Sequence, residues 1–206
     1  MLKLWGRITS INVQKVRWAL AELGVAHERI EAGMQFGVVN ESHYRVMNPN
    51  GRIPTIDDEG FVLWESNAIV RYLAARHGEG SLWPTELRMR ADADRWMDWA
   101  TTTLQPSVTP VFWGLIRSAP ETRNLKEIET QTAASNDAFQ IVDKVLASRP
   151  YLAGDSLTMG DIPLGTFVHR WYRLPVERPA MPHLDAYFER LQTRAAFRDN
   201  VMIPLS

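Results

Sequence analysis

The chain has 206 residues, enough to bury a sizeable core in one or two domains, and a formal net charge of −1 with no basic run or acidic tail. This balance gives no indication of nucleic acid or an anionic membrane as a partner. Cysteine is absent, which excludes disulfides, thiolate metal sites and a cysteine nucleophile. The histidines form no close pair with metal-ligand spacing, so we expect no metal. The first residues lack the apolar core of a signal peptide, and no apolar stretch approaches the length of a membrane span. We therefore expect a cytoplasmic protein.

The first part of the chain alternates strand and helix signals. Residues Leu2 to Trp5 form a short apolar run that is typical of a buried strand. Between Asn12, which precedes the pattern, and Gly24, which ends it, apolar residues recur every three or four positions and predict a helix. A second strand is expected over residues 25–30. Residues 31–48 contain glycines and are ambiguous between a loop and an irregular helix.

Turn signals at residues 48–51 introduce a predicted hairpin over residues 53–64. Ser66 is expected to cap a helix that ends near Gly78. A crossover through a helix implies a parallel pair of strands, and the hairpin adds an antiparallel pair. This order predicts an α/β thioredoxin-like domain over residues 1–80.

Strand signals disappear after a short linker, and residues 86–206 predict an all-α domain. Apolar residues recur at helical spacing from Met89 to Ala100. Pro106 and Pro110 should kink or interrupt this helix. Further helices are expected over residues 125–147, after the capping-box-like pair Thr158 and Asp161, and over residues 183–193.

Two motifs resemble the glutathione S-transferase superfamily. The segment Asn48–Ile56 (NPNGRIPTI) is a turn followed by an Ile-Pro pair, and the segment Trp64–Leu73 (WESNAIVRYL) places Glu-Ser at the start of a helix that ends in Tyr-Leu. Residues 158–161 resemble the capping box in the family's C-terminal domain. The resemblance covers essentially the whole chain. It implies a glutathione-binding domain followed by a helical domain that holds a second substrate.

The resemblance also implies which residues bind glutathione. Pro54 is expected in a cis peptide bond, so that the Ile53 backbone pairs with the cysteinyl part of glutathione like an added strand. Ser66 and the helix N-terminus suit the γ-glutamyl carboxylate, and Glu65 suits the ammonium group. Arg52 is expected to reach the glycyl carboxylate. Taken alone, Ser66 is also explained as an N-cap and Pro54 as a turn residue, but their order favours a glutathione site.

The catalytic residues are expected before and at the start of the first helix. Residues 7–16 contain no tyrosine and no cysteine, which argues against the family classes that use those residues. The segment resembles bacterial and fungal members with a Ser-x-Asn pattern, and this resemblance implies Ser10 and Asn12 as donors to the glutathione sulfur. Thr9 is a neighbour that would take the place of Ser10 as donor if the match were shifted in register. Either Ser10 or Asn12 could instead only cap the helix.

The reaction implied is glutathione transfer: the activated thiol of glutathione, a co-substrate, attacks a small hydrophobic electrophile. Two alternatives stay open, namely glutathione-dependent reduction of disulfides or peroxides, and a non-catalytic glutathione-binding scaffold. The retained Glu65, Ser66 and Pro54 argue against the scaffold. The family resemblance further implies a homodimer with an isologous interface. The aromatic residues available to line the electrophile pocket, or simply to fill the core, are Phe112, Trp113, Trp171 and Tyr172.

Overall fold

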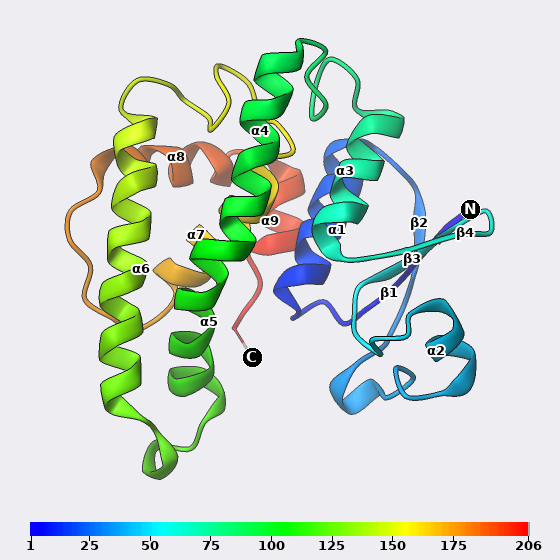
Figure 1. Ribbon diagram of the computed structural model, residues 1–206, viewed down its shortest axis with the longest axis horizontal. Helices are drawn as coiled ribbons and strands as arrows, with labels where there is room; N and C mark the ends of the chain where they lie inside the picture. The colour runs from blue at the N-terminus through cyan, green and yellow to red at the C-terminus, as the bar shows by residue number, and fades with distance from the viewer. Residues whose placement is uncertain (206) are drawn as a thin grey trace.

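The computed structural model describes residues 1–205, in which a mixed sheet with helices is followed by a helical half (Figure 1). The first half contains, in chain order, β1 (Leu2–Trp5), α1 (Ile11–Glu22), β2 (His27–Ile30), α2 (Ser42–Met47), β3 (Thr55–Asp58), β4 (Phe61–Trp64) and α3 (Ser66–His77). The second half contains α4 (Leu87–Trp99), α5 (Gln105–Phe112), α6 (Leu125–Leu146), α7 (Asp161–Tyr172), α8 (Pro182–Gln192) and α9 (Ala195–Val201). The predicted class, a thioredoxin-like α/β region plus an all-α region, is confirmed.

The sheet has the strand order β2-β1-β3-β4. Strand β1 pairs in parallel with β2 and antiparallel with β3, and β3 pairs antiparallel with β4. Leu4 and Ile56 lie side by side in the sheet and are fully buried against Val16 of α1 and Ile69 of α3. Because Val16 and Ile69 pack against the same sheet residues, α1 and α3 cover the same face of the sheet.

Helix α1 also packs against the helical half. It contacts α7 and α9, so it lies between the sheet and the second half of the chain (Figure 1). Trp18 of α1 is fully buried and meets Phe197 of α9 with ring centroids 4.8 Å apart. At the end of α1, Glu22 accepts hydrogen bonds at 2.8 and 2.6 Å from Arg194. These contacts hold α1 between the two halves through its second half.

The structure corrects several expected boundaries. Helix α1 begins at Ile11, so Asn12 lies inside it rather than before it. Helix α3 begins at Ser66, and the residue at its cap position is Glu65. The short helix α9 was missed.

Pro106 and Pro110 were expected to kink or interrupt the helix. They do not interrupt the helical path. The backbone instead forms π-helical turns on both sides of α5, over Ala100–Leu104 and Trp113–Arg117. Such wide turns absorb the loss of regular hydrogen bonding near proline. In the part of the chain that the structure describes, no helix combines the length and the apolar character required to cross a membrane.

Candidate functional site

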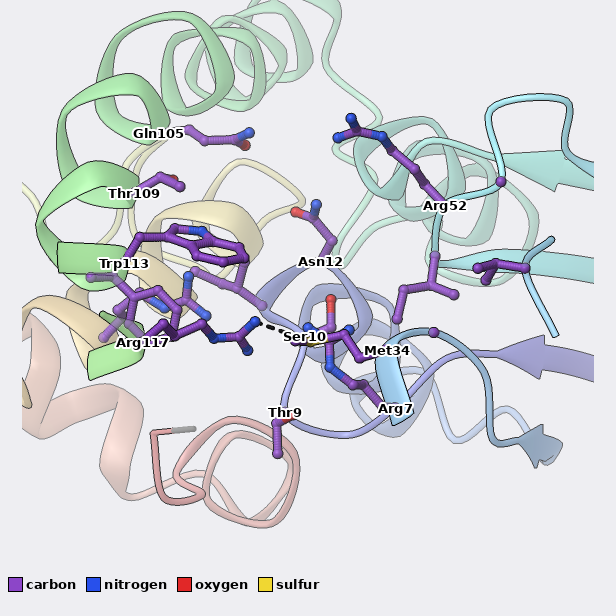
Figure 2. A pocket seen from close by; sticks show the side chains of 17 residues that line it. Arg7, Thr9, Ser10, Asn12, Met34, Arg52, Gln105, Thr109, Trp113 and Arg117 are labelled. Carbon is purple, nitrogen blue, oxygen red and sulfur yellow. Dashed lines mark hydrogen bonds between the residues drawn. The ribbon is translucent and has the colours of Figure 1, made fainter. Parts of the chain in front are cut away.

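A cavity of about 360 Å³ opens beside the start of α1, between the two halves of the chain. Figure 2 shows Ser10 and Asn12 at its centre, Arg52 on one side, and Gln105, Thr109, Trp113 and Arg117 projecting from the helical wall on the other. A second cavity of about 370 Å³ adjoins it and is lined by Lys15, Glu65, Ser66 and residues of the helical half. Asn12 and Gln105 line both cavities, so the two lie next to each other and make up one region of the molecule.

The structure brings most of the sequence-predicted site residues to this region. Ser10, Asn12, Arg52 and Ile53 line the first cavity, and Asn12 together with the pair Glu65–Ser66 lines the second. Pro54 lines neither cavity and is buried behind Ile53, but the Ile53–Pro54 peptide bond is cis as expected. The Ile53 backbone precedes β3 and takes part in no rung of the sheet.

Ser10 occupies the N-cap position of α1 without capping it through its side chain. Its backbone is extended, with φ −79° and ψ 122°, and its carbonyl oxygen accepts from the Gln14 amide at 2.9 Å. Serine at this position usually accepts a hydrogen bond from a helix N–H through its hydroxyl. The Ser10 hydroxyl makes no such bond. The hydroxyl therefore remains available to a bound molecule.

Asn12 is oriented by a buried lysine. Lys15 is 1% exposed, and its ammonium group donates a hydrogen bond of 3.0 Å to Oδ1 of Asn12. An ammonium can only donate, so the contact assigns the oxygen of the amide to the lysine side. The Asn12 NH₂ group is then left as a donor for the cavity.

Burial lowers the pKa of Lys15 to about 7, with repulsion from Arg170 lowering it further and attraction to Glu65 opposing the fall. The ammonium group also lies 5.2 Å from the ring centroid of Phe167. Burial of a lysine is rare in proteins, and a strongly shifted pKa beside a cavity is typical of functional sites.

Glu65 and Ser66 form a strained entry to α3. Glu65 has φ 72°, a left-handed conformation that is costly for a residue with a side chain. Such backbone outliers gather at functional sites. Ser66 is 7% exposed and is the first residue of α3, where backbone N–H groups lack partners within the helix. The second cavity therefore meets a helix N-terminus suited to a carboxylate.

A buried polar network supports the loop that carries Arg52 and Ile53. The Tyr44 hydroxyl donates to the Arg52 carbonyl oxygen at 2.7 Å, and Nδ2 of Asn48 donates to the same oxygen at 2.9 Å. Asn48 also reaches Oγ1 of Thr55 at 3.0 Å. The Asn-Pro turn of the sequence motif thus supplies a side chain that fixes the backbone beside the cavity, while the Arg52 side chain stays exposed.

Three arginines at the first cavity were not predicted. We call Arg7, Arg117 and Arg170 the arginine cluster. Burial lowers the pKa of Arg170 to about 9, and the charges of Arg117 and Arg7 add to the effect. Burial lowers the pKa of Arg7 too, and Arg117 contributes. These residues are far apart in the sequence and share no local motif.

Two of the four aromatic candidates line the cavity. Phe112 and Trp113 do so, whereas Trp171 is fully buried and stacks on Phe139 in the core. The fourth candidate, Tyr172, is a neighbour of neither cavity. Gln105, Thr109 and Trp113 follow one another at intervals of four residues, a helical face that the sequence pattern could have revealed.

Within residues 1–205, no group of three or more histidine, aspartate or glutamate side chains comes together in a way that could hold a metal ion. The second cavity contains the carboxylates of Glu65 and Asp98 and the ammonium group of Lys15. The polar groups that line the first cavity are hydroxyls, amides and guanidinium groups. Such groups bind and stabilise anions by donating hydrogen bonds.

Two family models match the chain. The family model described as glutathione S-transferase, N-terminal domain, matches residues 1–75, and that described as glutathione S-transferase, C-terminal domain, matches residues 104–195. Among curated proteins, the chain is 38% identical over 208 residues to glutathione S-transferase GstB of Escherichia coli (strain K12), covering 100% of both chains. It is 31% identical over 215 residues to glutathione S-transferase 3 of Zea mays, covering 99% of this chain and 95% of the relative.

Among solved structures, the chain is similar to the theta class glutathione S-transferase of Xanthomonas axonopodis pv. citri with glutathione bound. The TM-score is 0.96 and the identity 44%, covering 100% of this chain and 99% of the other. The apo form of the same protein gives a TM-score of 0.88.

Proposed function

Because this chain belongs to the glutathione S-transferase family, we propose that it lowers the pKa of the glutathione thiol and directs the thiolate at a small hydrophobic electrophile. The chain is a glutathione transferase with glutathione as co-substrate. One observation carries the finer proposal. Asn12 lines both adjoining cavities and so stands between the Glu65–Ser66 end and the Arg52–Ile53 end of one region.

Glutathione spans this region in the proposed complex. Its γ-glutamyl carboxylate binds Ser66 and the N-terminus of α3, and its ammonium group binds Glu65. The cysteinyl backbone pairs with Ile53, whose conformation is set by the cis bond to Pro54. Arg52 binds the glycyl carboxylate at the other end. This arrangement places the sulfur near Asn12, the residue common to both cavities.

Three features at the start of α1 favour the thiolate over the thiol. The Ser10 hydroxyl and the Asn12 NH₂ group donate hydrogen bonds to the sulfur, and both are free of the usual capping role. The helix N-terminus adds partial positive charge. Lys15 holds the Asn12 amide in its donating orientation. The electrophile then lies against Phe112 and Trp113, which supply an apolar wall.

Titration with glutathione at neutral pH, followed by the ultraviolet absorbance of the thiolate, tests the proposal. We expect a signal that saturates in the wild-type protein and is lost when Asn12→Ala and Ser10→Ala are combined. Thr130→Ala, which removes an exposed hydroxyl on α6, is the control and should keep the signal. A saturating signal that survives the double substitution would remove both residues from thiol activation.

Product analysis separates conjugation from reduction. A thioether formed from glutathione and an aryl halide supports transfer. Oxidised glutathione as the main product would support the reductase alternative instead.

We also propose a homodimer acting in the cytoplasm, with domains divided as residues 1–80 and 86–206. Light scattering coupled to size exclusion tests the assembly, and a monomer at micromolar concentration would contradict it.

A further inference from the structure

We infer that the arginine cluster binds an anionic group, a carboxylate or sulfonate, carried by the second substrate. The inference rests on the proposed function. It specifies the class of electrophile as an apolar molecule that carries a negatively charged substituent. Four arginines line the first cavity, Arg52 and the three of the cluster, and among its described lining residues none is aspartate or glutamate. The chain as a whole carries a net charge of −1, so this positive charge is local.

Arg170 is the member that points most clearly to a ligand. It is 6% exposed, lines the cavity, and its Nε has no hydrogen-bond partner within residues 1–205. Its guanidinium group stacks on Phe112, with Cζ 4.0 Å from the ring centroid. Stacking uses the face of the planar group and leaves the N–H edge for an acceptor. A buried guanidinium without a carboxylate partner is unfavourable unless an anion arrives.

The cluster is held together by shared contacts. Cζ of Arg117 lies 5.3 Å from the ring centroid of Phe112, the ring on which Arg170 stacks, and 4.8 Å from that of Trp113. Nη1 of Arg117 also contacts Sδ of Met34 at 3.0 Å across the cavity (Figure 2). Gathering like charges raises the free energy of the empty site, and a bound anion relieves this repulsion. Burial lowers the pKa values of Arg7 and Arg170, and the repulsion between the arginines lowers them further.

Glutathione does not account for this positive charge in the proposed complex. Its two carboxylates are assigned to the N-terminus of α3 and to Arg52. Arg117 and Arg170 belong to the helical half. Figure 2 shows Arg117 on the wall that faces Arg52 across the cavity. We therefore assign the anion that binds Arg7 and Arg170 to the molecule that the thiolate attacks. Its apolar part contacts Phe112 and Trp113, and its negative group contacts the guanidinium edges.

The test uses two aryl chlorides of similar shape, a chlorodinitrobenzoate, which is an anion, and the matching chlorodinitrobenzamide, which is neutral. In both, the thiolate sulfur forms a bond to the carbon that bears chlorine, and chloride leaves with the bonding electron pair. The readout is the ratio of kcat/KM for the anionic and neutral substrates. The intrinsic reactivities of the two substrates are the same for every variant, so they cancel when the ratio is compared between variants.

We expect Arg170→Met and Arg7→Met each to lower this ratio by roughly 10-fold or more. Arg88→Met, which removes an exposed arginine on α4, should leave the ratio unchanged. Arg7 is only partly buried, so we expect Arg7→Met to fold. It therefore provides the test if Arg170→Met does not fold. An unchanged ratio with a raised KM for glutathione would overturn the inference, since the cluster would then bind glutathione.

A binding measurement distinguishes this inference from the proposed function. Dinitrobenzoate and dinitrobenzamide lack a leaving group and cannot react, so calorimetry reports binding without turnover. Tighter binding of the benzoate, lost in Arg7→Met, supports the anion subsite even if no conjugation is found. Equal binding of the two compounds by an enzyme that conjugates the neutral substrate would overturn the subsite and leave the transferase intact.

Discussion

The ammonium group of Lys15 donates a hydrogen bond to Oδ1 of Asn12, inside the same turn of α1 and out of contact with solvent. The bond decides which end of the Asn12 amide faces the cavity. It also keeps a titratable cation close to the expected place of the sulfur. Lys15 is thus a positioning residue, which acts on the thiol through Asn12 and through its charge.

Replacing Lys15 with methionine should raise the pKa of the thiol of bound glutathione. The Asn12 amide loses the partner that fixes its orientation, and one positive charge disappears from the site. We expect the thiolate fraction at neutral pH and kcat/KM to fall by about 10-fold, with the pH profile displaced to higher pH. A fall in activity with no displacement of the profile would point to a structural role only.

Lys15 should also make stability depend on pH. Its pKa is about 7 in the folded protein and lies below the ordinary value of 10.5. Between these values the unfolded chain binds more protons than the folded one, so stability rises with pH in that window. The free energy of unfolding of the wild type, minus that of Lys15→Met, should increase by at most about 1.4 kcal/mol per pH unit. Urea unfolding at pH values across the window measures it, and a flat difference would contradict the lowered pKa.

Asn12→Asp places a carboxylate where the amide was, with almost the same shape. The new negative charge repels the thiolate and pairs with Lys15, so the pKa of glutathione and that of Lys15 should both rise. We expect at least a roughly 10-fold loss of the thiolate signal. Glutathione affinity measured by calorimetry at acid pH, where the thiol is protonated, should change much less. Retention of the full thiolate signal would exclude Asn12 as the donor.

Asp161 is expected to be the most sensitive polar position of the helical half. It is fully buried and accepts from the backbone N–H of Leu152 at 3.0 Å and of Thr158 at 2.8 Å. Asp161→Ala leaves both N–H groups without partners, and we expect a loss of about 2 to 4 kcal/mol in stability. Asp161→Asn keeps one acceptor and should lose less. Equal losses for the two variants in urea unfolding would contradict this account.

Motifs with local causes were predictable, and contacts between distant segments were not. The hairpin before α3 was found because turn residues act within a few positions. The short motifs around it carry the family resemblance, and that resemblance implied the cis Ile53–Pro54 bond. The arginine cluster joins position 7 to position 170 through the packing of α1 against α7, for which the sequence has no short-range signal. The roles of the site residues stay predictions.

Two misses have particular physical reasons. Lys15 belongs to a segment that was singled out, but lysine is almost always exposed, so its burial was not expected. Helix α9 has only 7 residues, too few to show a helical period. It forms because Phe197 packs on Trp18, a tertiary contact rather than a local preference.

The cavity has walls of different origin, which affects how the enzyme can change over evolution. The thiol side is built from the start of α1 and the Arg52–Ile53 loop, whereas Gln105, Thr109 and Trp113 lie on one continuous helical rod. Substitutions along that rod alter the shape and charge presented to incoming compounds without touching the nucleophile. A lineage, or a library randomised at these three positions, can therefore explore new xenobiotics while keeping the same thiol chemistry.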